Sequence, residues 1–92
     1  SGNFRQEAKY NHISAICFWR AGVYEEALHS FHQSSDAFFK AGDEKGALKA
    51  LSNIGALYNL LAQNDSAKTY LTRSLVLAKT IEDSSLLPKI LY

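Results

Sequence analysis

The stretch that decides the fold is SNIGALYNLLAQNDSAKTYLTRSLVLAK, residues 52–79. It holds one glycine and neither histidine nor cysteine, and none of its residues is an obvious catalytic group. Its small and large apolar residues recur at regular intervals, which is the pattern of amphipathic helices. A fainter version of the same stretch lies earlier in the chain. The sequence therefore predicts a repeated helical unit that is defined by side-chain size.

The composition of all 92 residues supports a small helical protein. Apolar residues make up 47% and charged residues 21%, which is typical of a folded chain rather than a disordered one. A chain of this length forms one small domain at most. It has only one proline and five glycines, and no segment alternates apolar and polar residues as a half-buried strand does. We expect an all-α fold.

Helix starts and stops recur along the chain. Asn3, Asp43 and Asp83 are spaced by forty residues, and each is of a type that caps a helix N-terminus. Gly22 and Gly42 can end helices, because glycine accepts the left-handed conformation that follows a last turn. The expected helices span about 4–21, 24–41, 44–61, 64–81 and 86–92, and Pro88 is expected either to leave 83–86 as a turn or to kink the helix there.

The repeat is visible in residue size rather than in identity. Overlaying residues 3–42 on 43–82 gives three identities, but small residues align with small ones and large with large. The aligned pairs are Ala15/Gly55, Phe18/Tyr58, Gly22/Ala62, Ala27/Ala67 and Phe31/Leu71. Small residues allow two helices to approach closely, and large ones fill the space between them. Stacked helical hairpins build their core in this way.

The segment AGVYEEALHSF, residues 21–31, resembles the densest part of the tetratricopeptide repeat, Gly-x-Tyr-x-x-Ala-x-x-x-Phe. The second unit shows the same order through Gly55, Tyr58, Ala62, Ala67 and Leu71. Asn11 and Leu51 stand where the common repeat prefers Trp, and neither unit has the usual closing proline. The period is 40 rather than 34, which resembles the longer variant found in kinesin light chains and G-protein-signalling modulators.

This resemblance implies an α–α superhelix of tetratricopeptide type. It would contain two full repeats, 3–42 and 43–82, and the first helix of an incomplete third, 83–92. Residues 1–92 would then form a single repeat domain that is a fragment of a longer protein. The resemblance further implies that the first helix of each repeat lines a concave groove that holds a peptide of a partner protein.

The resemblance places a set of residues in that groove. They are Lys9, His12, Ile16, Trp19 and Arg20 in the first repeat, Lys49, Asn53 and Asn59 in the second, and Lys89 in the third. The three lysines share one repeat position, so an acidic segment of a partner could lie between them. The alternative is that each lysine extends into water on its long stem.

Asn53 and the apolar anchors add two further hypotheses. Asn53 could bond the backbone of a bound peptide, because an amide is both donor and acceptor, or it could bond a neighbouring helix. Ile16 and Trp19 would form an exposed apolar patch beside Arg20, unless Trp19 packs against another helix layer. Only Asn53 and Lys89 match the five positions by which some relatives grip chaperone carboxylates, so we do not predict chaperone binding.

Catalytic, metal and cofactor sites are not expected. His29, His32 and Asp36 share one helix face, but their spacing is weak for a metal and no fourth ligand is evident. Cys17 could pair with His12 as nucleophile and base, but it stands in an apolar stretch and is expected to be a buried structural residue. No phosphate loop or nucleophile motif occurs, so an enzyme is not predicted.

The net charge and the cysteine content limit the expected partners and the expected cellular location. A net charge of +1 favours neither nucleic acid nor a membrane surface, and no apolar run is long enough to span a bilayer. The single cysteine excludes an internal disulfide and favours a cytoplasmic location. We expect a non-catalytic scaffold or adaptor that binds a peptide. The alternatives are a structural module that self-associates through exposed repeat ends, or a sensing segment of a regulator.

Overall fold

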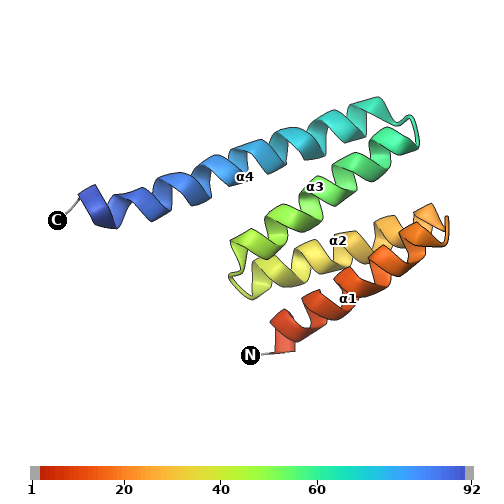
Figure 1. Ribbon diagram of the computed structural model, residues 1–92, viewed down its shortest axis with the longest axis horizontal. Helices are drawn as coiled ribbons and strands as arrows, with labels where there is room; N and C mark the ends of the chain where they lie inside the picture. Colours follow the sequence, from red (N-terminus) through yellow and green to blue (C-terminus); the bar gives the residue numbers. More distant parts are fainter. Residues whose placement is uncertain (1–2, 91–92) are drawn as a thin grey trace.

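The computed structural model describes the backbone of residues 3–90 and the side chains of residues 3–84. Over this range the chain forms four helices and no strand: α1 (Asn3–Arg20), α2 (Tyr24–Lys40), α3 (Glu44–Leu60) and α4 (Asn64–Ile90). Each helix runs antiparallel to the one before it and packs against it (Figure 1). The predicted all-α fold is confirmed, and the first three helices lie within a residue of their expected ends.

The same turn connects every pair of neighbouring helices. Gly22, Gly42 and Ala62 have φ values of 79°, 73° and 60°, in the left-handed region. In each turn this residue donates its N–H to the carbonyl three residues back, and the next residue donates to the carbonyl five residues back, at 2.9–3.0 Å in the first and third turns. These two bonds define the Schellman motif, which satisfies carbonyls that a helix end leaves unpaired. Gly22 and Gly42 are therefore helix stops, as predicted.

These turns give the backbone a spacing of twenty residues, half of the predicted repeat. Ala27, Ala47 and Ala67 each donate a backbone N–H to the residue just before their helix, and all three are buried. Asp43 is the predicted start of α3, and its side chain accepts a bond from the N–H of Gly46 at 3.0 Å. A single turn thus ends one helix and leads directly into the next, with a side-chain cap at the start of α3 and none at the start of α2.

Two clusters of buried residues hold the first three helices together. One contains Ala15 of α1, Ala27 and Phe31 of α2, and Ile54 and Leu57 of α3. The other contains Ala8, Ala37, Phe38 and Ala47, with Leu77 of α4 packed against it. The buried hydroxyl of Ser34 donates to the carbonyl oxygen of Ala8 at 2.9 Å, which ties α2 to α1 within the second region.

Two glycines mark close approaches, as the size pattern predicted for Gly55. A Cβ on Gly55 would stand 2.8 Å from the Leu71 side chain and 3.3 Å from its backbone nitrogen. A Cβ on Gly46 would overlap the ring of Phe38. Both sites leave no room for a methyl group, so α3 lies closer to α4 and to α2 than a larger residue would allow.

The predicted turn at 83–86 and the separate helix after it are wrong. Asp83 starts no helix, because α4 runs without a break from Asn64 to Ile90, and Pro88 lies within that span. Twenty residues after Ala62, where the other helices stop at a left-handed residue, the chain has Glu82, which is a good helix former. The segment 83–90 is therefore a continuation of α4 and not the first helix of a third repeat.

Candidate functional site

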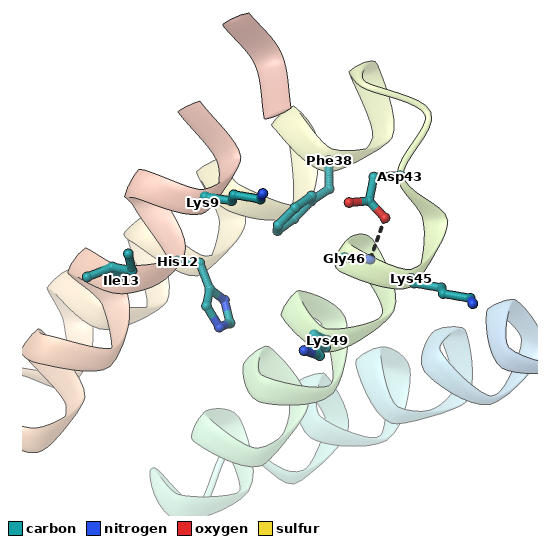
Figure 2. Close-up of a pocket in the computed structure, with 8 residues that line it drawn as sticks. All are labelled: Lys9, His12, Ile13, Phe38, Asp43, Lys45, Gly46 and Lys49. Atoms are coloured by element: carbon teal, nitrogen blue, oxygen red, sulfur yellow. Dashed lines mark hydrogen bonds between the residues drawn. The ribbon is translucent and has the colours of Figure 1, made fainter. Parts of the chain in front are cut away.

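A groove of about 380 Å³ lies between α1 and α3 (Figure 2). We call it the α1–α3 groove. Its lining contains three lysines, a histidine and an aspartate, together with an isoleucine, a phenylalanine and a glycine. The lining residues are Lys9, His12, Ile13, Phe38, Asp43, Lys45, Gly46 and Lys49. They come from three helices and the turn before α3.

The structure brings three of the predicted site residues together in this groove. Lys9 and His12 extend from α1, and Lys49 extends from α3 on the opposite side (Figure 2). Lys9 and Lys49 are forty residues apart in the chain. They line the same groove because α2 runs back between the two helices, so α1 and α3 point the same way along one face (Figure 1).

The groove carries positive charge. Among the described residues that line it, Asp43 is the one carboxylate, against three lysines. Its Oδ1 already accepts the capping bond from Gly46, and its Oδ2 lies 3.9 Å from Nε of Arg5. Asp43 is thus committed to the helix start and to Arg5, and the ammonium groups of Lys9 and Lys49 have no carboxylate within ion-pair distance in the described part of the chain.

His12 is a second polar group in the groove. Its Nδ1 is buried and has no hydrogen-bond partner among the described residues. Its ring stands edge-on to the ring of Phe31, with centroids 5.7 Å apart. Burial lowers the pKa of His12, and the positive charge of Lys49 lowers it further. His12 is therefore mainly neutral at pH 7, and its ring adds a polar group to the wall of the groove while Nδ1 itself is buried.

The floor of the groove is apolar. The ring of Phe38 is buried against Gly46, and the aliphatic side chain of Ile13 is exposed at the rim. Phe38 lies beside the groove because Gly46 has no side chain to cover it. An apolar floor next to charged walls is the usual arrangement of a specific binding pocket.

Sequence reasoning missed Phe38, Asp43, Lys45 and Gly46. The resemblance assigned the groove to first helices of repeats, and Phe38 belongs to α2. One signal was present in the sequence: Gly46 lies in the first turn of α3, where a residue with a side chain is more favourable unless a neighbour needs the space. A large side chain packed against Gly46 was therefore to be expected.

The predicted exposed patch of Ile16 and Trp19 is wrong. Both side chains are half-buried and pack against the cluster around Phe31. The indole of Trp19 stands edge-on to the Phe31 ring at 5.9 Å and 87°. Phe31 projects from α2 towards α1, so the residues that face it from α1 belong to the core. Neither of them lines the groove.

The remaining predicted residues lie outside the α1–α3 groove. Arg20 and Asn59 are exposed near the ends of α1 and α3, and Asn53 is half-buried on α3. Within residues 3–84 the Asn53 amide makes no hydrogen bond to a neighbouring helix, so the structural alternative has no support. The side chain of Lys89 lies outside the described residues.

The other candidate chemical groups are placed as follows. Cys17 is exposed, and the expectation of a buried cysteine is wrong, because this position faces outward on α1. His32 contacts Tyr58, with Nε2 3.3 Å from the hydroxyl, and its ring stands edge-on to Tyr70. Burial lowers the pKa of His32, and Asp36 opposes that shift. The described residues contain no group of three potential metal ligands.

No family model matches the chain, and no curated protein or solved structure shows significant similarity to it. None of the helices in the described part is both long enough and apolar enough to cross a membrane. The site must therefore be interpreted from its own geometry.

Proposed function

We propose that this chain is a tetratricopeptide-type repeat domain that acts as a non-catalytic adaptor. It binds a peptide segment of a partner protein in the α1–α3 groove. The observation that supports the proposal is that Lys9 and His12 of α1 line the same groove as Lys49 of α3. The aligned Ala27 and Ala67, both buried at the same place after identical turns, support the repeat.

The groove favours an acidic peptide with an apolar side chain. Lysines on both walls attract carboxylates and speed association, and like charges on a basic peptide would be repelled. The ring of Phe38 and the side chain of Ile13 offer apolar contact next to the charges. A volume of about 380 Å³ holds a few side chains, so the recognised segment is short.

Direct titration with a defined peptide tests this proposal. The probe is a fluorescein-labelled heptapeptide that alternates Asp and Leu, and binding is measured by fluorescence anisotropy. The control peptide has Asn in place of each Asp. We expect the acidic peptide to bind and the Asn peptide to bind at least about tenfold more weakly, which corresponds to about 1.4 kcal/mol.

Variants locate the binding. Lys9→Ala and Lys49→Ala remove the two facing ammonium groups, and Lys79→Ala removes an exposed lysine of α4 as a matched control. We expect weaker binding for each groove variant and unchanged binding for Lys79→Ala. Asn53→Ala tests whether the groove extends along α3. Equal affinity for both peptides, or an equal effect of Lys79→Ala and Lys49→Ala, contradicts the proposal.

A further inference from the structure

Two tyrosine rings lie next to each other where α3 and α4 meet. Tyr58 belongs to the last turn of α3, and Tyr70 belongs to the first half of α4. Their ring centroids are 5.6 Å apart, and the ring planes are inclined by 31°. Both side chains are half-buried and pack against the cluster around Phe31. Neither tyrosine lines the α1–α3 groove, so peptide binding there does not account for the pair.

A histidine of α2 contacts both rings. Nε2 of His32 lies 3.3 Å from the hydroxyl oxygen of Tyr58, and the imidazole stands edge-on to Tyr70 with centroids 5.3 Å apart. Burial lowers the pKa of His32 and raises the pKa of Tyr58, so at pH 7 the imidazole is mainly neutral and the phenol is protonated. In the tautomer that carries its proton on Nδ1, His32 accepts the hydrogen bond that Tyr58 donates.

This hydrogen bond makes the Tyr58 phenol easier to oxidise. Loss of one electron turns a phenol into a strong acid, so the electron leaves readily only when the proton leaves with it. A neutral imidazole within hydrogen-bond distance is a suitable acceptor for that proton. The second ring is held close by, because the guanidinium carbon of Arg73 lies 5.1 Å from the Tyr70 centroid in a cation–π contact. A radical formed at Tyr58 therefore has another phenol beside it.

We propose that Tyr58 and Tyr70 form a site of oxidative cross-linking, at which a one-electron oxidant joins them as dityrosine and His32 takes the phenolic proton of Tyr58. Each ring gives one electron to the oxidant and releases its phenolic proton, which passes from Tyr70 to water. A C–C bond then forms between ring carbons ortho to the two oxygens. The hydrogen on each joined carbon moves as a proton to the oxygen of its ring. The product thus lacks two hydrogen atoms, and the oxidant has gained two electrons.

The cross-link fastens the helix at the edge of the array (Figure 1). α4 packs mainly against α3, and the new bond joins these two helices across the turn between them. It closes a short loop in the unfolded chain and so lowers the entropy of that state. We therefore expect the cross-linked chain to unfold at a higher urea concentration than the untreated chain.

Oxidation in solution tests the proposal directly. The oxidant is tris(bipyridine)ruthenium(III), generated from the ruthenium(II) complex by light and persulfate. Cys17 is exposed and its thiol is readily oxidised, so every protein carries Cys17→Ser. Dityrosine fluorescence follows the reaction, and mass spectrometry of proteolytic fragments identifies the linked residues. We expect a single chain that lacks two hydrogen atoms, with the Tyr58 fragment joined to the Tyr70 fragment. A main product that links two chains, or that links Tyr10, overturns the proposal.

Three variants locate the reaction. Tyr58→Phe and Tyr70→Phe each remove a phenol and keep the ring, so the fold is retained, which far-ultraviolet circular dichroism checks. Each is expected to abolish the cross-link. Tyr10→Phe is the matched control, because Tyr10 is 72% exposed on α1, and it should leave the yield unchanged. Cross-linking that persists in Tyr58→Phe, or that decreases equally in Tyr10→Phe, contradicts the proposal.

The pH dependence of the cross-linking rate tests the role of His32. Protonated His32 cannot take the proton of Tyr58, and the charged groups that act on it are Asp36 and His29 of α2 and Arg73 of α4. The rate should be constant near pH 7 and should decrease below pH 6.5, as the pH falls through the lowered pKa of His32. His32→Gln keeps a hydrogen-bonding group but not a base, so it should react more slowly at pH 7 and lose this pH dependence. If the parent and His32→Gln have the same rate and pH profile, His32 is not the proton acceptor and the proposal is rejected.

Discussion

Equivalent faces of α2 and α4 have opposite environments. On α2, Phe31 is fully buried under α1 and α3, whereas Leu71, forty residues later, is 42% exposed. The two residues have the same place after the same turn, and both are large and apolar. The difference comes from the neighbouring helices, because α2 is packed on two sides and α4 on one. Position within a repeat therefore predicts which way a side chain points but not whether it is covered.

The largest predicted difference in stability is between variants that truncate these two side chains. Phe31→Ala leaves a cavity between three helices, at the ring that both His12 and Trp19 contact edge-on. We expect a loss of about 3–5 kcal/mol in the free energy of unfolding. Leu71→Ala removes a half-exposed side chain and costs roughly 1 kcal/mol. Urea denaturation followed by circular dichroism measures both values.

Equal losses for Phe31→Ala and Leu71→Ala would contradict the comparison. The measurement is made at a concentration at which the chain is monomeric, so that the Leu71 value reports folding alone.

The turns offer a second, smaller contrast. Ala62 takes the left-handed conformation that glycine takes in the other two turns, with φ at 60°. This conformation costs a residue with a Cβ roughly 1–2 kcal/mol, and part of the gain from glycine is lost to chain entropy. We expect Ala62→Gly to stabilise the fold by about 0.5–1 kcal/mol.

Gly22→Ala is the reciprocal change. A Cβ on Gly22 meets no atom within 4 Å, so any loss reports backbone conformation and not a clash. We expect destabilisation by about 1 kcal/mol. Changes of the same sign in the Gly22 and Ala62 variants, in thermal or urea unfolding, would show that the turns are not equivalent.

The dependence of stability on pH gives the smallest effect. Burial lowers the pKa values of His12 and His32 from 6.5, so the unfolded chain binds more protons below that pH. The free energy of unfolding should therefore be constant above about pH 7 and decrease as the pH falls through 6.5 towards the folded pKa values.

Replacing the two histidines one at a time separates their contributions to the pH dependence of stability. His12→Gln and His32→Gln should each reduce the slope of unfolding free energy against pH between about pH 7 and 5. Urea titrations at several pH values measure the slope. An unchanged slope in the double variant would show that other groups carry the pH dependence.

The α1–α3 groove was half predictable. Lys9, His12 and Lys49 followed from the resemblance, which implies that the first helix of each repeat lines the groove. Phe38 and the glycine beneath it were not predicted, because their contact joins α2 to α3 and depends on the absence of a side chain. The packing of Ile16 and Trp19 against Phe31 was not predictable, because nothing local in α1 shows that Phe31 of α2 reaches them.

Local chemistry was enough to predict the helices and most of their ends. Asp43 caps α3, and Gly22 and Gly42 stop α1 and α2, through hydrogen bonds that span at most five residues. Such bonds depend on residue type and immediate neighbours, so they can be inferred from the order of amino acids. The extension of α4 past Asp83 was missed because a weak cap signal was given more weight than the absence of a left-handed stop.

Burial was decided by packing between distant segments. Cys17 is exposed while Leu57, the aligned residue of α3, is fully buried, and Leu75 is exposed while Ser35 is buried. Nothing in the local sequence around either pair shows which of its two residues is buried. Covering a side chain needs a second helix at the right distance, and only the folded arrangement of α1 to α4 determines where that helix lies.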